Sequence, residues 1–379
     1  MECFASLIAQ PSISSFDPRL DQSNRTMVDL LAEWLEGLGF GVELIPVSTK
    51  PAKFNLVACA GSGSGGLVLA GHTDTVPCDV AAWRQDPFRL TERDHKLYGL
   101  GAADMKCFFP ILIDAIRDID LTRLVQPLYV LATCDEESTM AGARSLVTSG
   151  RQLGRYALIG EPTGLKPVNR HKAIIMEKIR LIGRAGHASD PALGINALEG
   201  MHGVISGLQQ WRSFIQAKHH DPAFRIAEPT LNFGSIHGGD NPNRICAECE
   251  MTIDLRLLPG MDLEEVRAGI RQTSMQAVDG SGLIIEFESI ITGIPAMHTD
   301  SAAEIVKIAE QLAGEPAGAV AFGTEGPYFN AMGMATVVLG PGDIEQAHQA
   351  DEYLALERVK PMQALLGKLI KHFCIDTQP

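Results

Sequence analysis

The sequence predicts an α/β protein with a mixed, mostly parallel sheet that is flanked by helices on both faces. One reason is a set of short apolar runs that are continuous rather than alternating, as is typical of strands buried on both faces. These runs occupy residues 67–70, 128–131, 157–159 and 336–339. Helical segments lie between and around the runs, and this alternation indicates a sheet that is covered on both sides.

The helical segments are recognised by apolar residues at helical spacing. In residues 26–38, Met27, Leu31 and Leu35 form one apolar stripe, and Gly39 ends the pattern. Two further segments have a similar pattern, residues 105–117 and 302–312. We therefore expect helices at all three places.

The middle of the chain has a different order of elements, which predicts a second domain inserted into the first. The expected order is a strand at 174–182, a helix at 195–211, strands at 230–236 and 245–257, a helix at 263–277 and a strand at 283–288. This order is the split βαβ pattern of a small ferredoxin-like α+β sandwich. The predicted domains are residues 1–172 and 291–379 for the main domain and 173–290 for the inserted one.

Composition and charge exclude several classes of partner. The 379 residues include 46 acidic and 32 basic side chains, for a formal net charge of −14. Such an acidic chain is repelled by nucleic-acid phosphates and by anionic membrane surfaces. We see no apolar run near the ~20 residues that span a bilayer and no signal-peptide pattern. Eight scattered cysteines do not form a compact disulfide framework. A cytoplasmic protein is expected.

Acidic residues and histidines follow the predicted strands at the places where an α/β sheet binds its ligands, beyond the carboxyl ends of the strands. They are His72, Asp74, Glu136, Glu137, Glu161 and His348, and Asp104 precedes the helix at 105–117. Converging carboxylates repel one another unless cations neutralise them, and His and carboxylate ligands suit zinc or a similar divalent ion. For any single position, a helix N-cap is the alternative. For the whole set, we expect a metal site.

Five separated motifs occur in one order over nearly the whole chain. They are GHTDTVP at 71–77, YGLGAADMK at 98–106, DEE at 135–137, GEPT at 160–163 and AHQ at 347–349. This pattern resembles the di-zinc metallohydrolase family of aminoacylases, succinyl-diaminopimelate desuccinylase and glutamate carboxypeptidase. The resemblance implies a zinc-exopeptidase-like catalytic domain, and it implies that the inserted domain is a lid or dimerisation domain. Within the family, the stretches at 231–240, 243–246, 339–342 and 346–353 resemble those of an enzyme that deacetylates N2-acetyl-L-ornithine.

The resemblance also implies a set of metal ligands. Asp104 would bridge two divalent metal ions, with Zn²⁺ expected and Co²⁺ as an alternative. His72 and Glu161 would complete the ligands of one ion, and Glu137 and His348 those of the other. The peptide bond after Asp104 is expected to be cis, as is typical of the family.

Three further residues are assigned catalytic roles by the resemblance. Asp74 would orient the imidazole of His72 through its second nitrogen. Glu136 would be the general base for a water shared by the two ions. His187 would donate to the oxyanion, often across the interface of a homodimer in this family.

The residues expected to bind the substrate rest on fewer observations. Arg256 lies on the polar face of its strand and could bind an α-carboxylate with two hydrogen bonds, although a surface salt bridge is an equal alternative. Asn243, Gly323 and Thr324 match positions of the family that line the pocket. Glu325 is expected to pair with the side-chain ammonium of ornithine.

Other functions stay open beside the expected one. A related deacylase of another N-acyl amino acid, a succinyl-diaminopimelate desuccinylase or a dipeptidase would use the same site. A metal-binding protein without catalysis is an alternative from a different class, and the presence of Glu136 argues against it. The expected partners are a small-molecule N-acyl amino acid and a second copy of the chain, without nucleic acid or membrane.

Overall fold

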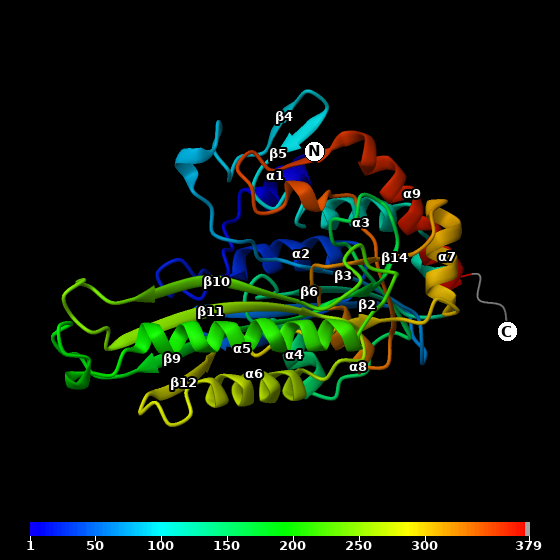
Figure 1. Ribbon diagram of the computed structural model, residues 1–379. Coiled ribbons are helices and arrows are strands. Elements are labelled where there is room, and N and C mark those ends of the chain that lie inside the picture. The colour runs from blue at the N-terminus through cyan, green and yellow to red at the C-terminus, as the bar shows by residue number, and fades with distance from the viewer. Residues whose placement is uncertain (376–379) are drawn as a thin grey trace. The chain divides into compact units, whose positions relative to one another are not determined.

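The chain folds into two compact units, and the second is inserted into the first (Figure 1). The structure is a computed structural model that describes residues 1–375. The first unit comprises residues 1–169, 298–318 and the chain from 324 onward, and the second comprises 170–297 and 319–323. The predicted domains 1–172, 173–290 and 291–379 stay predictions, and their last four residues, 376–379, lie outside the described residues.

A mixed sheet forms the centre of the first unit. Its described strands follow the order β1 (Gly41–Thr49), β2 (Ala52–Ala60), β6 (Leu128–Thr133), β3 (Leu67–His72), β7 (Tyr156–Ile159), β15 (Ala335–Val338), β8 (Val168–His171) and β13 (Met297–His298), and β14 (Gly318–Val320) pairs with β8. The four central strands β6, β3, β7 and β15 run parallel, whereas β2 and β8 pair with them in the antiparallel direction. The carboxyl ends of the four parallel strands therefore meet at one edge.

Helices cover both faces of this sheet (Figure 1). They are α1 (Glu2–Ile8), α2 (Arg25–Gly37), α3 (Phe108–Arg117), α4 (Ala141–Thr148), α7 (Glu304–Ala313), α8 (Gly326–Ala331) and α9 (Val359–Ile370). The main core lies between the sheet and the group α2, α3, α7 and α9, where Leu69 packs with Leu31 and Leu112. Among the described residues, no helix is long and apolar enough to span a bilayer. A small sheet of β16 (Tyr353–Ala355), β5 (Lys96–Tyr98) and β4 (Thr91–Arg93) completes the unit.

The predicted fold class is confirmed, and most predicted elements of the first unit are present. Helix α3 begins at Phe108 rather than at 105, because residues 101–107 form turns. Strand β3 continues through His72, beyond the apolar run, because its polar end is buried as well. The prediction misses β1 and β2, which lie at one edge of the sheet. Strand β1 is half exposed and therefore has no continuous apolar run.

The second unit has the predicted order of elements. Its sheet is antiparallel in the order β10 (Thr230–Gly238), β11 (Glu248–Leu257), β9 (Ala173–Ile182) and β12 (Ile284–Ser289). Helices α5 (Ala197–Lys218) and α6 (Leu263–Ala277) pack on one face of this sheet. The alternation of β9 buries Ile175, Ile179 and Leu181 against Leu208 of α5 and Ile270 of α6. The unit therefore has a hydrophobic core of its own.

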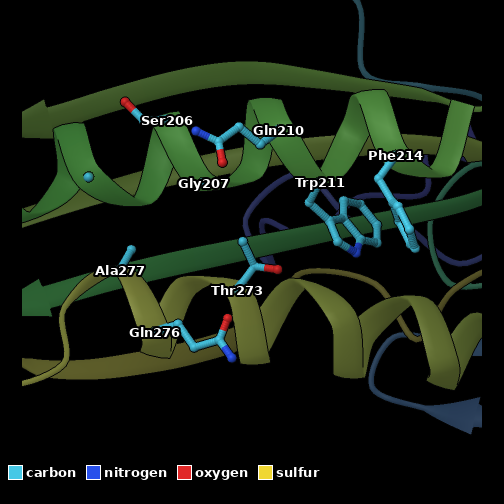
Figure 2. Close-up of a pocket in the computed structure, with 9 residues that line it drawn as sticks. Ser206, Gly207, Gln210, Trp211, Phe214, Thr273, Gln276 and Ala277 are labelled. Carbon is cyan, nitrogen blue, oxygen red and sulfur yellow. The ribbon is translucent and has the colours of Figure 1, made fainter. Parts of the chain in front are cut away.

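A groove runs between α5 and α6 on the outside of the second unit (Figure 2). Small side chains bring the two helices close together: a Cβ on Gly207 would lie 3.2 Å from Thr273 Cγ2, and one on Gly269 would lie 2.8 Å from Trp211 Nε1. The groove is lined by Gly203, Ser206, Gly207, Gln210, Trp211, Phe214, Thr273, Gln276 and Ala277. Phe214 at its end is 54% exposed. The helical face of this unit thus carries apolar surface.

Candidate metal centre

The ends of three adjacent strands bring four of the predicted site residues to one edge of the sheet. His72 is the last residue of β3, and Glu136 and Glu137 follow the end of β6 at Thr133. Glu161 lies two residues beyond the end of β7. Because β3 pairs in parallel with both β6 and β7, these side chains emerge at the same end of the sheet.

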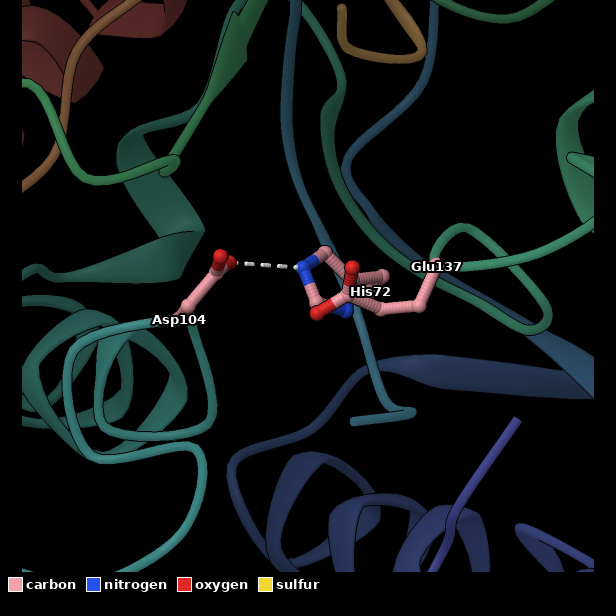
Figure 3. Close-up of side chains that lie close together, drawn as sticks. All are labelled: His72, Asp104 and Glu137. Atoms are coloured by element: carbon pink, nitrogen blue, oxygen red, sulfur yellow. Dashed lines mark hydrogen bonds and ion pairs between the residues drawn. The ribbon is translucent and has the colours of Figure 1, made fainter. Parts of the chain in front are cut away.

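His72 lies at the centre of the cluster (Figure 3). Its Nε2 is 3.0 Å from Asp104 Oδ1 and 3.8 Å from Glu161 Oε1. Two groups have their potential ligand atoms within 4.8 Å of one another: His72 with Asp104 and Glu137, and His72 with Glu136 and Glu161. The peptide bond between Asp104 and Met105 is cis, as expected.

His348 approaches the cluster from the other side of Asp104. Its Nε2 lies 3.0 and 3.2 Å from the two carboxylate oxygens of Glu137 and 3.8 Å from Asp104 Oδ2. The two oxygens of Asp104 therefore face different histidines, Oδ1 towards His72 and Oδ2 towards His348. All five predicted metal ligands are thus brought together, with Asp104 facing both histidines and with Glu137 in contact with His348.

Asp74 contacts the second ring nitrogen of His72 through its main chain. The nearest partner of His72 Nδ1 is the main-chain carbonyl oxygen of Asp74 at 3.0 Å, whereas the carboxylate oxygen Oδ1 is 3.8 Å away. The carboxylate instead accepts a hydrogen bond from the main-chain N–H of Glu137 at 3.0 Å. Asp74 therefore holds the ring with its backbone and holds the loop of Glu137 with its side chain.

The cluster is electrostatically strained without cations. Burial raises the pKa of Glu136 well above its usual value, and the neighbouring charge of Glu161 raises it further. Burial raises the pKa of Glu161 to about 8, with Asp104 as the next cause. Burial alone would lower the pKa of His72, but the charges of Glu161 and Asp104 raise it well above the usual value. The carboxylates therefore hold protons or attract cations.

The donor set fits divalent metal ions. Two imidazole nitrogens and several carboxylate oxygens are the ligands that Zn²⁺ and related ions prefer. Four of these side chains are less than 10% exposed, namely His72, Asp104, Glu137 and Glu161. Solvent therefore screens the repulsion between the carboxylates only weakly. Ions in the cluster would compensate the charges of these carboxylates in place of protons.

A buried lysine supports the loop that carries Glu136 and Glu137, and sequence reasoning did not single it out. Lys53 is 1% exposed, and its Nζ lies 2.7 Å from Asp135 Oδ1 and 2.8 Å from Asp21 Oδ1. Ser14 Oγ donates a further hydrogen bond to the same oxygen of Asp135 at 2.9 Å. Asp135 has a positive φ of 57°, a strained conformation that these contacts stabilise. No sequence motif connects Lys53 to Asp135.

Four predicted site residues belong to the second unit, namely His187, Asn243, Arg256 and Gly323. His187 is exposed, and its Nδ1 is 2.7 Å from Ser189 Oγ. Asn243 is exposed too, and its carbonyl accepts a hydrogen bond from Ala188 N–H at 3.0 Å. The guanidinium of Arg256 forms two hydrogen bonds, of 2.9 and 3.1 Å, with the carboxylate of Asp254. The salt bridge expected as the alternative for Arg256 is therefore present.

The loop of residues 323–325 contains the remaining predicted residues. A Cβ on Gly323 would lie 2.8 Å from Ile174 Cδ1, so a larger residue there would have to displace the end of the Ile174 side chain. Thr324 is buried, and its Oγ1 accepts a hydrogen bond from Gly326 N–H at 3.0 Å. Glu325 is completely buried, and its Oε2 is 2.8 Å from Thr133 Oγ1 at the end of β6. Its Oε1 has no hydrogen-bond partner among the described residues.

The fold and the cluster together are typical of metallohydrolases. Comparison with known proteins identifies the family. The sequence profile of peptidase family M20/M25/M40 matches residues 68–372, more than half of the chain, and the chain belongs to this family. The family predicted from the motifs is thereby confirmed. The chain is also 48% identical over 374 residues to an acetylornithine deacetylase of Pasteurella multocida, with 99% of this chain and 98% of that relative covered.

Solved structures of low sequence identity share the fold. A tripeptidase of Staphylococcus aureus has a TM-score of 0.77 at 21% identity, over 98% of this chain and 96% of that one. A dinuclear metal-binding peptidase of the M20 family from Bacillus subtilis has a TM-score of 0.69 at 16% identity, over 97% of this chain and 95% of that one. These two likenesses establish the fold alone.

Metal binding should release protons, because the pKa values of the predicted ligands Glu161, His348 and His72 are raised, which favours their protonated forms at pH 7. The pKa of Glu161 is raised to about 8, and the hydrogen bond with Glu137 raises that of His348 to about 9. Metal ions bind only the deprotonated groups. The affinity for Zn²⁺ should therefore increase as the pH rises from 7 to 9. Calorimetric titration of the metal-free protein in two buffers of different ionisation enthalpy measures this release, and a buffer-independent enthalpy at pH 7 would contradict it.

Proposed function

We propose that the chain is a dinuclear metal hydrolase that converts N2-acetyl-L-ornithine to L-ornithine and acetate, a step of arginine biosynthesis. The observation that carries the proposal is that the two oxygens of Asp104 face different histidines, Oδ1 towards His72 and Oδ2 towards His348. The 48% identity to an acetylornithine deacetylase over nearly the whole chain supports the choice of substrate. A deacylase of another N-acyl amino acid, a desuccinylase and a dipeptidase are the alternatives within the family.

The ligands are assigned to two ions by their positions in the cluster. His72 and Glu161 would hold one ion, Glu137 and His348 would hold the other, and Asp104 would serve both. Zn²⁺ is the proposed ion, and Co²⁺ would accept the same nitrogen and oxygen ligands. When bound, two such ions would polarise the amide carbonyl and lower the pKa of a water between them.

Glu136 is the proposed general base. It is 8% exposed and lies in the same group of potential ligand atoms as His72 and Glu161, but Glu137 rather than Glu136 contacts His348. Its carboxylate would take the proton of the attacking water and deliver it to the leaving amine nitrogen.

The second unit is proposed to be a lid and dimerisation domain, as the family resemblance implies. Its own core and its antiparallel sheet, with β10 and β12 at the two edges, make it a separate folding unit. His187 in this unit would donate a hydrogen bond to the oxyanion, either in its own subunit or across a homodimer. Its exposure leaves the ring accessible to a partner.

Substrate recognition is proposed to involve Glu325, Arg256 and the residues near them. Glu325 has a buried, unpartnered carboxylate oxygen, which could pair with the ammonium of ornithine. Arg256 would have to exchange its bonds with Asp254 for a substrate carboxylate, so nothing in its contacts supports that role. Asn243, Gly323 and Thr324 are proposed to line the pocket.

The substrate and the metal dependence can be tested in one assay. Acetate release from N2-acetyl-L-ornithine should exceed both acetate release from N-acetylmethionine and succinate release from succinyl-diaminopimelate. Removal of metal by a chelator should abolish turnover, and added Zn²⁺ or Co²⁺ should restore it. Activity that survives complete metal removal would contradict the mechanism, and preference for another of the three substrates would favour a sister enzyme.

Glu136→Gln should separate catalysis from metal binding. The substitution keeps the shape of the side chain but removes the base, so turnover should fall by about 10²-fold or more. Metal content, measured by elemental analysis, should stay at the wild-type level because Glu136 is not a proposed ligand. If Glu136→Gln loses metal in proportion to activity, Glu136 is a ligand rather than the base.

Glu325→Gln tests recognition of the ornithine ammonium. A charged hydrogen bond is worth about 1.5–3 kcal/mol, so the kcat/KM for N2-acetyl-L-ornithine should fall by about 10- to 100-fold relative to N-acetyl-L-norvaline, which lacks the amine. The measurement is the ratio of the two kcat/KM values. An unchanged ratio in the variant would leave Glu325 without a part in binding the ammonium.

A further inference from the structure

One buried carboxylate outside the predicted site contacts the loop of Asp104. Glu352 comes four residues after His348 and directly before β16, which pairs with β5 in antiparallel register, Tyr353 opposite Tyr98. This pairing places Glu352 against the loop that follows β5. The main-chain N–H of Gly99 donates to the carbonyl of Glu352 at 3.1 Å, so the backbones of the two segments are bonded as well.

The side chain of Glu352 accepts three main-chain hydrogen bonds from that loop. Oε2 accepts from Gly101 N–H at 2.9 Å, and Oε1 accepts from Ala103 N–H at 2.7 Å and from Asp104 N–H at 3.0 Å. Glu352 is 2% exposed, and a buried carboxylate is tolerated only when its oxygens are hydrogen-bonded. The three N–H groups provide this compensation, and in return they are fixed in one arrangement.

The rest of the loop is shaped to this contact. Gly101 has a positive φ of 80°, and a Cβ there would lie 2.9 Å from Thr75 Cγ2. Lys106, two residues beyond Asp104, is 1% exposed, and its Nζ donates to the carbonyl of Gln10 at 2.7 Å. The loop is therefore held on both sides of Asp104, by Glu352 at its main chain and by Lys106 at its end.

We propose that Glu352 is a positioning residue of the metal centre, which fixes the main chain of residues 101–104 so that Asp104 can face His72 and His348 at once. The inference rests on the proposed function, because only a shared ligand needs both of its oxygens directed. Glu352 and His348 belong to one short segment, so the same contact also sets His348 relative to Asp104. Partners that orient a metal ligand typically change metal affinity or activity by about 10- to 100-fold when they are removed.

A matched control exists in the second unit. Glu177 is also 2% exposed, and its Oε1 accepts hydrogen bonds from Arg267 Nε at 2.8 Å and from Ser289 Oγ at 2.7 Å. It contacts none of the proposed ligands in the hydrogen bonds and ion pairs described for residues 1–375. Its substitution removes a buried carboxylate of the same kind without a link to the metal centre.

The test compares Glu352→Gln with Glu177→Gln by metal titration and kinetics. Glutamine keeps the shape of the side chain but replaces one acceptor oxygen by a donor, so one of the three loop N–H groups loses its partner. In Glu352→Gln, the affinity for the more weakly bound Zn²⁺ should fall by about 10- to 100-fold. At limiting Zn²⁺ its kcat should fall in parallel, with KM changed by less than about threefold, and excess Zn²⁺ should restore kcat. In Glu177→Gln, the melting temperature should fall while both ions stay bound with wild-type affinity.

The outcomes separate this inference from the proposed function. Wild-type protein that binds no Zn²⁺ would overturn the proposed function and this inference with it. Wild-type protein that binds two ions, together with Glu352→Gln that binds both with unchanged affinity, would overturn this inference alone. If Glu352→Gln does not fold, Glu352→Asp and Glu177→Asp replace the pair, since aspartate keeps the charge but is one methylene shorter. If neither Glu352 variant folds and the Glu177 variants do, Glu352 is a residue of folding and the positioning role is wrong.

Discussion

Asp104, Glu136, Glu137 and Glu161 lie together at one edge of the sheet, where their negative charges repel one another with little screening by water. The arrangement of the first unit depends on compensating this repulsion. The imidazoles of His72 and His348 face the carboxylates directly. The main-chain N–H of Glu137 donates to the carboxylate of Asp74, and the buried ammonium of Lys53 anchors the loop of Glu136 through Asp135. Closely spaced carboxylates and imidazoles are suited to bind cations, because each ion compensates several negative charges at once.

Much of the fold could be predicted because buried strands and amphipathic helices leave strong patterns in the sequence. The four central parallel strands are continuous apolar runs, and the elements of the second unit follow the split βαβ order. Strand β1 is half exposed, so its residues alternate weakly and resemble a loop in the sequence. Strand β2 is mostly buried, but the polar residues Lys53 and Asn55 interrupt its apolar pattern.

The positions of the proposed ligands could be predicted because strand ends in an α/β sheet converge, but their supporting contacts could not. Asp104 and Glu352 are 248 residues apart in sequence, and their bond depends on the pairing of β16 with β5. The carbonyl of Asp74, rather than its carboxylate, faces His72, and sequence alone cannot choose between two acceptors of one residue. Sequence alone also cannot show that Arg256 binds Asp254, which is two residues away on the same face of β11.

The insertion of the second unit has a consequence for synthesis of the chain on the ribosome. The second unit is almost continuous in sequence, so it can fold as soon as residues 170–297 have emerged. The first unit has to wait longer, because β15 lies between β7 and β8 in its sheet, and His348 follows later still. Until then, Glu137 and Asp104 lack their contacts with His348. The metal centre is thus completed late in the synthesis and folding of this chain.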